Sequence, residues 1–168
     1  MKMLTVVISY YKKLNNLQLI LKALNNQSSN YFEVVLSEDD HNEETIRYLE
    51  NIKPKLNFPI IHIYQLEDVG FRKNAMLNRA ICAANTDKIA FIDGDGIPHR
   101  HFVKQYIEEI DKSSLCTGRA VFLDKKTSEL LWKTQSLESL NLFRLFFSDT
   151  KKLKDGIYFP LFPLSNKV

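Results

Sequence analysis

Two aspartates, Asp93 and Asp95, follow the apolar run IAFI and are separated by a single glycine. Two carboxylates aimed at one point repel each other unless a cation lies between them. Mg²⁺ and Mn²⁺ prefer such hard oxygen ligands and leave coordination positions for substrate phosphates. A cation held there can neutralise a diphosphate leaving group. The spacing therefore favours a Mn²⁺ or Mg²⁺ site, while an ordinary solvated turn stays open because Asp and Gly are common turn residues.

Two other kinds of site carry a similar Asp-x-Asp pattern. An EF-hand calcium loop needs an oxygen ligand at Ile97, a glycine at Pro98 and a glutamate at Lys104, so the sequence excludes it. A phosphatase of the haloacid-dehalogenase type carries the motif on its first strand, whereas three strand-helix units precede it here. A metal-dependent phosphohydrolase therefore remains only as an outside alternative.

The elements that position the two aspartates alternate along the chain. Short apolar and β-branched runs predict strands at five places: 4–10, 32–36, 59–65, 88–92 and 115–123. Helical patterns lie between them, at 17–24, 43–52, 72–84 and from Pro98 to Ile110. This order predicts an α/β fold with a mostly parallel sheet flanked by helices. A weaker stripe predicts one more helix, through Leu137, Leu140, Phe143 and Phe147.

Polar residues gather where three of the predicted strands end. They are Ser9-Tyr10-Tyr11, Glu38-Asp39-Asp40 and Asp93-Gly94-Asp95. Ligands of parallel α/β folds bind beyond the carboxyl ends of the strands. The pattern therefore predicts one ligand site at this edge of the sheet.

Bulk properties limit the remaining possibilities. The 168 residues suit one globular domain, and the net charge of +3 is too small and too evenly spread to indicate nucleic acid as a partner. Cys82 and Cys116 are predicted to be buried thiols in a reducing compartment. No apolar run is long enough for a membrane span and no signal peptide is recognised, so we expect a cytoplasmic protein. The apolar segment 157–164 is predicted to cover a core edge, touch a membrane surface or meet a partner segment.

The stretch GFRKNAMLNRAICAANTDKIAFIDGDGIPHRHF resembles the donor half of family-2-type glycosyltransferases with the GT-A fold. Those enzymes typically show Gly-Phe-Arg, then Asn and Ala-Ile on a helix, then a strand that ends in Asp-x-Asp, often followed by Ile-Pro-His. The matching residues are Gly70, Phe71, Arg72, Asn78, Ala80, Ile81, Asp93, Asp95, Ile97, Pro98 and His99. The resemblance implies a Rossmann-like GT-A nucleotide-diphospho-sugar transferase fold. It also implies a donor-binding domain at 1–124 and an incomplete acceptor region at 125–168 that packs on it.

The resemblance implies roles for individual residues. The donor nucleotide would be held by Ser9, Tyr10, Glu38, Asp39, Arg72, Asn78 and Asp93, and the metal by Asp95 with Asp93. For Arg72 the alternative is a surface ion pair, and for Asn78 an amide buried in helix packing. Glu38 departs from the family pattern, which usually has aspartate at this position.

The activity implied is transfer of a hexose from a nucleotide-diphosphate sugar, with a UDP-sugar expected, to a glycan or lipid-linked acceptor hydroxyl. Transfer would be inverting and metal-dependent, in polysaccharide or glycan biosynthesis, in the cytoplasm or at the inner face of the membrane. Nothing after Asp124 resembles the Trp-Gly-x-Glu-Asp-like segment in which the family places its general base, so no catalytic residue is assigned. A non-catalytic nucleotide-sugar-binding module is therefore the alternative, and peripheral membrane contact and homo-oligomerisation stay open.

Overall fold

The computed structural model describes residues 4–67, 69–110, 112 and 115–156. The chain divides into two compact units, residues 1–116 and 117–168. The first unit contains the sheet and its helices, and the described residues of the second unit form helices and no strand. The two units are described separately.

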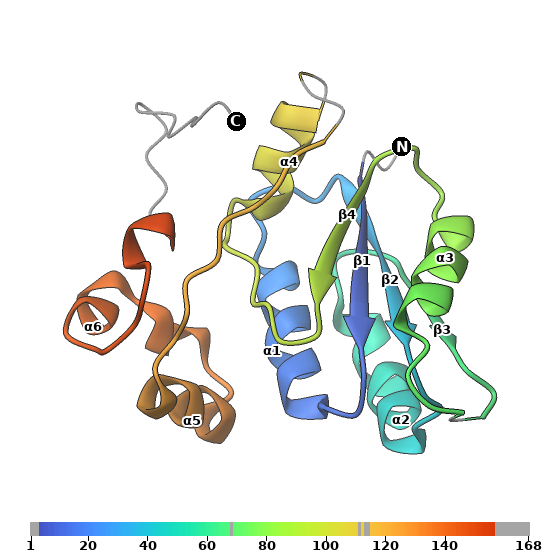
Figure 1. Cartoon of the computed structure of the whole chain (residues 1–168), viewed down its shortest axis with the longest axis horizontal. Helices are drawn as coiled ribbons and strands as arrows, with labels where there is room; N and C mark the ends of the chain where they lie inside the picture. The colour runs from blue at the N-terminus through green and yellow to red at the C-terminus, as the bar shows by residue number, and fades with distance from the viewer. Residues whose placement is uncertain (1–3, 68, 111, 113–114, 157–168) are drawn as a thin grey trace. The chain divides into compact units, whose positions relative to one another are not determined.

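The first unit is built on four parallel strands in the order β3-β2-β1-β4 (Figure 1). Their bounds are β1 Leu4–Tyr10, β2 Phe32–Glu38, β3 Ile60–Tyr64 and β4 Ile89–Asp93. Strands β1 and β2 lie in the middle and are buried along nearly all of their length, as is typical of the inner strands of a parallel sheet covered on both faces. The predicted α/β fold with a parallel sheet flanked by helices is thus confirmed.

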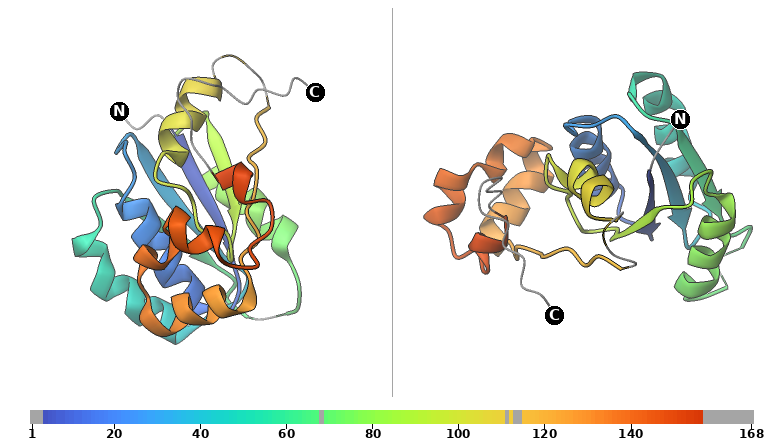
Figure 2. Two further views of the ribbon diagram at one scale, coloured as in Figure 1. Left: turned by 90° about the vertical axis from the view of Figure 1, so that its left-hand side faces the viewer. Right: turned by 90° about the horizontal axis from the view of Figure 1, so that it is seen from above.

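Helices cover both faces of this sheet (Figure 2). Their bounds are α1 Leu14–Asn25, α2 Glu43–Ile52, α3 Lys73–Ala83 and α4 Phe102–Ile110, with a short 3₁₀ helix η1 at Lys53–Lys55. Helices α1, α2 and α4 pack against the larger core cluster on one face. Helix α3 packs on the other face, where Ala80 meets Val7 and Val35.

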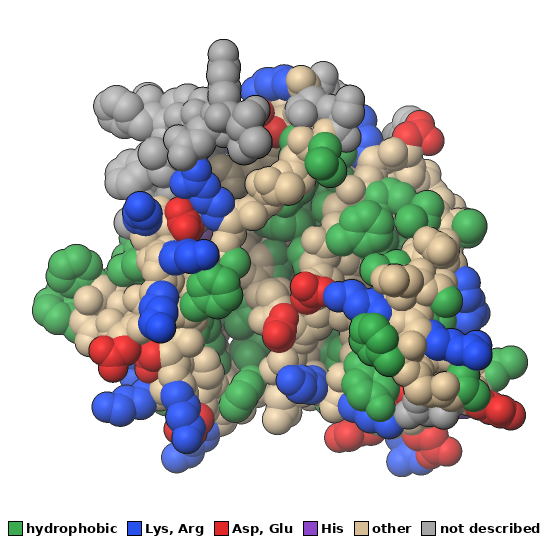
Figure 3. Space-filling model, in the orientation of Figure 1, with side chains coloured by type: hydrophobic (Ala, Val, Ile, Leu, Met, Phe, Trp, Pro, Cys, Tyr) green, Lys and Arg blue, Asp and Glu red, His purple; other side chains and the backbone are tan. Residues whose placement is uncertain are grey.

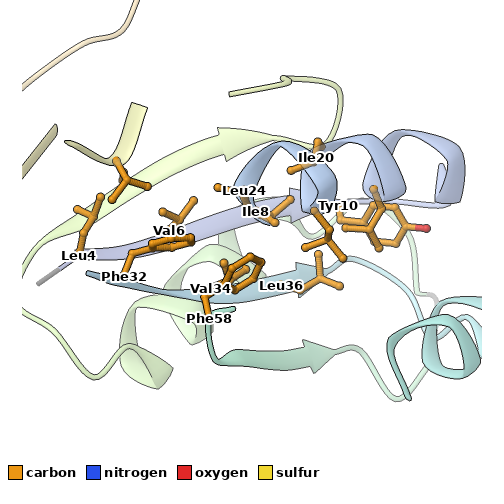
Figure 4. Packing of buried hydrophobic residues seen from close by; sticks show 14 of the residues in the cluster. Leu4, Val6, Ile8, Tyr10, Ile20, Leu24, Phe32, Val34, Leu36 and Phe58 are labelled. Carbon is orange, nitrogen blue, oxygen red and sulfur yellow. The ribbon is translucent and has the colours of Figure 1, made fainter. Parts of the chain in front are cut away.

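The larger core cluster shows why the sequence folds in this way (Figure 4). The predicted stripe on α1 is fully buried: Leu17, Ile20, Leu21 and Leu24. It meets alternate residues of β1 and β2, because successive side chains of a strand point to opposite faces. Each such side chain contributes about 1.5–3 kcal/mol through removal from water. Tyr10 and Leu36 continue this row of side chains to the carboxyl ends of their strands (Figure 4).

Helix α4 begins at Phe102 and not at Pro98 as the sequence predicts. The side chain of Gln27, at the end of α1, accounts for the difference. Its amide nitrogen donates to the carbonyl of His99 at 2.9 Å, and its oxygen accepts from the amide of Val103 at 3.0 Å. The segment before α4 is therefore fastened to α1 in a non-helical conformation.

The second unit contains α5 Lys125–Thr134, the 3₁₀ helix η2 Leu137–Leu140, α6 Leu142–Phe146 and the 3₁₀ helix η3 Leu153–Gly156. Asp124 caps α5 by accepting from the amide of Thr127 at 3.1 Å and from its hydroxyl at 2.6 Å. The Thr127 hydroxyl and amide, in that order, lower the pKa of Asp124 to about 2.

The predicted fifth strand at 115–123 is wrong. In its described residues only Phe122 makes a β-bridge, antiparallel to Lys151, and Leu115 is 80% exposed. A strand needs a ladder of backbone partners, and one bridge does not provide it.

The predicted single helix through Leu137 and Phe147 is also wrong. The chain breaks at Asn141, whose side chain caps α6 by accepting from the amide of Arg144 at 2.8 Å. Phe143 and Phe147 are 78% and 74% exposed, so the stripe does not face a core.

Three smaller expectations concern the cysteines, the membrane and the C-terminal segment. Cys82 is exposed and Cys116 half-buried, so the prediction of buried thiols is wrong. No helix in the described part of the chain is long and apolar enough to cross a bilayer. The apolar segment 157–164 lies outside the described residues.

Candidate active site

The sheet register brings the predicted polar clusters to one edge. Ser9, near the end of β1, lies between Ser37 on β2 and Asp93 on β4. Residues in register on neighbouring strands project to the same face, here the face covered by α3. The cluster after β2 joins them, because the amide of Asp39 donates to the carbonyl of Tyr10 at 2.9 Å.

The Asp-Gly-Asp segment forms a tight turn packed against the end of β1. The amide of Gly96 donates to the carbonyl of Asp93 at 2.9 Å and closes the turn. A Cβ atom on Gly94 would lie 2.7 Å from the carbonyl oxygen of Ser9, closer than real contacts allow. Glycine is therefore required at this position by the close approach of two backbones, while both flanking aspartates remain exposed.

Lys73 meets the first of the two aspartates. It is the first residue of α3, and its ammonium donates to Oδ1 of Asp93 at 2.5 Å. Helix α3 begins without a side-chain cap and without an acidic residue in its first turn. Its free amide groups and Lys73 together give this edge positive character beside Asp93. Figure 3 shows basic and acidic side chains side by side near the end of β4.

Lys73 is a residue of this edge that the sequence pattern did not predict. The available signal was its position directly after Arg72 in the Gly-Phe-Arg segment. Arg72 itself is exposed and stands at the N-cap of α3. Two cationic side chains are thus adjacent in sequence at the start of this helix.

Asp39 is buried and holds the loop that leads into α3. Its Oδ1 accepts from the side-chain amide of Gln65 at 2.7 Å, and its Oδ2 accepts from the backbone amide of Arg72 at 2.9 Å. Gly70 lies in the same loop with φ +94°, a conformation that L side chains rarely adopt.

Tyr10 and Glu38 lie beneath the surface of this edge. Tyr10 is 2% exposed, and its hydroxyl is 3.1 Å from that of Thr45 on α2. Burial raises the pKa of Tyr10 to about 12. Glu38 is fully buried, with Oε2 2.7 Å from Nε2 of His62. Both side chains are buried, and their predicted part in donor binding stays a prediction.

Two buried oxygen atoms at this edge lack a hydrogen-bond partner within the described residues. They are Oγ of Ser37 and Oε1 of Glu38. A buried polar group without a partner costs about 1–3 kcal/mol and calls for an explanation such as a bound water or ligand. The edge therefore retains unused hydrogen-bonding capacity.

Tyr11 offers an exposed aromatic ring at the same edge. It directly follows β1, is 50% exposed, and has the ammonium of Lys12 4.6 Å from its ring centroid. Lys12 has φ 51°, an uncommon conformation for a residue other than glycine. The chain thus turns sharply where β1 ends and presents Tyr11 to solvent.

The fold does not bring Asn78 to the residues at the carboxyl edge of the sheet. It is exposed on α3 and lines a shallow surface pocket with Arg79, Cys82 and Ala83. Asn78 is five positions after Lys73, which places it about 7.5 Å further along the helix and on another side. Its predicted part in donor binding stays a prediction.

The carboxylate oxygens of Asp93 and Asp95 are ligands that suit a divalent cation of the magnesium type. The described part of the chain contains no group of three or more His, Cys, Asp and Glu side chains that could enclose a metal. Mg²⁺ commonly binds through one or two carboxylates, with water and substrate phosphates as the other ligands. Two exposed carboxylates beside a cationic helix start fit that pattern.

These features define a parallel α/β protein with exposed acidic residues at the carboxyl edge of its sheet. Residues 5–162 match the model of Glycosyl transferase family 2, so the chain belongs to that family. Members of this family commonly use a divalent metal.

Curated relatives resemble the chain over most of its length. A chondroitin synthase of Pasteurella multocida (strain Pm70) is 26% identical over 124 residues, which cover 72% of this chain and 12% of that protein. A hyaluronan synthase of Pasteurella multocida is 26% identical over 143 residues, which cover 82% of this chain and 14% of that protein. The chain thus spans less than a fifth of the length of these relatives.

Solved structures share the fold. S. aureus TarS matches with a TM-score of 0.55 and 24% identity over 67% of this chain and 20% of that one. TarS 1–349 in complex with UDP-GlcNAc matches with a TM-score of 0.50 and 23% identity over 73% of this chain and 34% of that one. The predicted GT-A fold is therefore confirmed.

Proposed function

We propose that this chain binds a UDP-sugar and transfers its hexose, with inversion and with a divalent metal, to an acceptor hydroxyl in polysaccharide or glycan biosynthesis. The observation that carries the proposal is the exposed Asp93-Gly94-Asp95 turn, packed against Ser9 and facing Lys73 at the start of α3. The relatives are synthases of chondroitin and hyaluronan, and one TarS structure with this fold contains UDP-GlcNAc.

The cationic residues at the start of α3 contact the diphosphate in this proposal. Lys73 and Arg72 offer an ammonium and a guanidinium, and the uncapped helix start adds backbone amide donors. A Mn²⁺ or Mg²⁺ ion held by Asp95 and Asp93 would neutralise charge on the leaving diphosphate. In the free protein the ammonium of Lys73 pairs with the carboxylate of Asp93.

The remaining residues act on the nucleoside side. Ser9 and Asp93 lie in register and face the ribose or the sugar. Asp39, Glu38 and Tyr10 support the edge from beneath, because all three side chains are buried.

The acceptor side belongs to the same proposal. Residues 1–124 would bind the donor, and residues 125–168 would form part of an acceptor region for a glycan or lipid-linked hydroxyl at the cytoplasmic face of a membrane. Inverting transfer needs a carboxylate as general base near that hydroxyl. Asp124 is occupied in capping α5 and Asp155 pairs with Arg119 at 3.2 Å. Glu129, Glu138 and Asp149 are exposed acidic groups in this part of the chain, and a nucleotide-sugar-binding module without its own general base is the second candidate.

Thermal unfolding with UDP, GDP or inorganic phosphate, each with and without Mn²⁺, tests the donor site. A ligand at 100 times its dissociation constant stabilises the folded state by about 2.7 kcal/mol. We expect stabilisation by UDP that increases with Mn²⁺, and we expect Asp95→Ala to remove the increase. Asp87→Ala is the matched control, because Asp87 is an exposed aspartate just before β4.

An unchanged Mn²⁺-dependent shift in Asp95→Ala would refute the assignment of the metal. Stabilisation by phosphate alone would instead favour a phosphohydrolase. Release of UDP from a UDP-sugar in the presence of an acceptor then separates a transferase from a binding module.

A further inference from the structure

Three phenylalanine side chains of the second unit form an exposed cluster at the end of α6. Phe143, Phe146 and Phe147 are 78%, 72% and 74% exposed. The ring centroid of Phe147 lies 5.1 Å from that of Phe143 and 5.4 Å from that of Phe146. Leu145 is the buried residue of this helix. The folded chain therefore presents three large apolar rings to solvent in one place, which we call the phenylalanine cluster.

Charge is divided unequally between the two units. Residues 117–168 contain nine Lys and Arg against five Asp and Glu, whereas residues 1–116 contain fourteen against fifteen. Every Lys and Arg that the structure describes in the second unit is exposed. Two of its acidic groups are engaged internally, Asp124 as the cap of α5 and Asp155 in a pair with Arg119. The phenylalanine cluster thus belongs to a unit with a basic surface, and Figure 3 shows Lys and Arg side chains spread over this unit.

Basic residues accompany the phenylalanine cluster in the sequence. Arg144 stands between Phe143 and Phe146 and is exposed. Lys151 and Lys152 follow the cluster and are also exposed, and the ammonium of Lys152 lies 4.9 Å from the ring centroid of another exposed phenylalanine, Phe122. Exposed apolar groups rimmed by polar residues mark an interaction surface. A bilayer that contains anionic lipids matches both parts of this surface, because it offers an apolar interior to the rings and phosphates to the cations.

We infer that the phenylalanine cluster docks the second unit on an anionic lipid surface. The three rings enter the headgroup region, and Arg144, Lys151 and Lys152 pair with lipid phosphates. The ring geometry favours lipid over a glycan as the partner. The planes of Phe143 and Phe147 are inclined by 65° and those of Phe146 and Phe147 by 85°, so the cluster has no common flat face on which sugar rings could stack. This inference does not depend on the donor site.

Co-sedimentation of the 168-residue chain with lipid vesicles tests the inference without any nucleotide. We expect binding to vesicles of phosphatidylcholine with about 30% phosphatidylglycerol, and binding weaker by about tenfold or more to phosphatidylcholine alone. A rise in NaCl from about 0.05 to about 0.5 M should weaken binding to the anionic vesicles, because salt screens the charges. A chain that does not bind anionic vesicles would overturn the inference.

Removal of two rings tests the phenylalanine cluster itself. Phe143→Ala/Phe147→Ala should weaken binding to anionic vesicles by about tenfold or more, because less apolar area leaves water on docking. The matched control is Tyr31→Ala/Leu66→Ala, which removes side chains that are 63% and 82% exposed on the first unit. Its vesicle affinity should stay within about twofold of the natural protein. An equal loss in the control would show that the cluster is not the docking surface.

Removal of two cations tests the electrostatic part. Arg144→Gln/Lys151→Gln should weaken binding by about 25-fold, because each basic side chain near an anionic surface contributes about fivefold. Lys53→Gln/Lys55→Gln removes the same charge from exposed positions of η1 and should lose less than about threefold. Equal losses in both pairs would mean that net charge alone drives binding, against the inference. Thermal unfolding without lipid should be the same in all these variants and the natural protein.

Fluorescence distinguishes entry of the rings into lipid from adsorption by charge alone. Trp132 is the single tryptophan of the sequence, so Trp132→Phe/Phe147→Trp carries its one indole in the phenylalanine cluster. We expect its emission to shift to shorter wavelength with anionic vesicles, and lipids brominated in their acyl chains to quench it. Absence of quenching would overturn the inference. A complex with dextran sulfate that needs the phenylalanines, without binding to vesicles, would assign the surface to an anionic glycan instead.

Discussion

The two ends of strand β2 each carry a buried glutamate, and the two carboxylates are treated differently. Glu33, at the amino end, accepts from the hydroxyl of Thr5 at 2.8 Å and from the backbone and side-chain amides of Asn85 at 2.7 and 3.0 Å. Glu38, at the carboxyl end, is 2.7 Å from His62 through one oxygen, while its other oxygen has no partner among the described residues. One end uses its carboxylate fully and the other does not.

The residues around the two glutamates differ in the same way: they are buried at the amino end and exposed at the carboxyl end. At the amino end, Thr5 is fully buried and lies in register with Glu33. At the carboxyl end, Asp93 and Asp95 are exposed in a turn that leaves their carboxylates accessible. The amino end thus stabilises the chain by satisfying its polar groups internally. The carboxyl end keeps polar groups available, which is where ligands of parallel α/β folds bind.

Gly94→Ala should damage the carboxyl end most. The added Cβ would meet the Ser9 carbonyl at 2.7 Å, so the turn must move away from β1 and carry both aspartates with it. We expect Mn²⁺-dependent UDP binding to weaken more than tenfold, which corresponds to about 1.4 kcal/mol or more. Isothermal titration calorimetry with and without Mn²⁺ measures this loss.

Gly96→Ala is the matched control for this prediction, because its Cβ would lie 3.4 Å from the carbonyl of Asp93, an ordinary contact. Its UDP affinity should stay within about twofold of the natural protein, or about 0.4 kcal/mol. If both variants lost the same amount of UDP affinity, the turn would tolerate no substitution at either glycine. The close approach of Gly94 to Ser9 would then not be the cause of the loss.

Glu33→Ala should affect stability and not ligand binding. Removing this acceptor takes away one of the two partners of the buried Thr5 hydroxyl and two part-buried hydrogen bonds from Asn85, so the free energy of unfolding should fall by about 1–3 kcal/mol in urea titrations. The dissociation constant for UDP should change less than twofold. Glu50→Ala, at an exposed position on α2, should change stability by less than about 0.5 kcal/mol. A large loss of UDP affinity in Glu33→Ala would erase the contrast between the two ends.

Tyr10→Phe should have a smaller effect that depends on pH. The pKa of Tyr10 is raised to about 12 by burial, so the folded state holds its proton more tightly than the unfolded state, whose tyrosine titrates near 10. Its contribution to the free energy of unfolding is fully present below pH 10 and is lost as the pH rises toward 12, by up to about 2.7 kcal/mol. Unfolding titrations from pH 8 to 11 should therefore show a flatter decline in Tyr10→Phe than in the natural protein.

Tyr31→Phe, in which the replaced ring is 63% exposed, should follow the natural protein. Tyr48 keeps some alkaline dependence in all these variants, because burial also raises its pKa. An identical pH profile in Tyr10→Phe and the natural protein would contradict the burial of the Tyr10 hydroxyl against Thr45.

Most of the first unit could be predicted from sequence because local pattern and final burial agree. The bounds predicted for β1 and α2, residues 4–10 and 43–52, are those observed. The carboxyl ends of β1, β2 and β4 meet as predicted, since parallel strands end at one edge. The roles predicted for Ser9, Arg72 and Asp95 in donor and metal binding stay predictions.

The second unit was predicted less well. Its aromatic residues have strand and helix propensity, but Phe122 makes one bridge and Phe143 is exposed. Propensity determines secondary structure only weakly where few neighbours bury the side chains. This explains why the strand predicted at 115–123 and the helix predicted through Leu137 and Phe147 are wrong, while the predictions around β1 are confirmed.

The sequence by itself determined the strand-helix alternation, the acidic turn after β4 and the resemblance to family-2-type glycosyltransferases, because these depend on residues close together in the chain. Only the tertiary structure decided that Lys73 contacts Asp93, that Gln65 holds Asp39, and that Glu38 and Tyr10 are buried. Those contacts join strands and helices far apart in sequence. Their partners are set by sheet register and by helix packing, which no local pattern specifies.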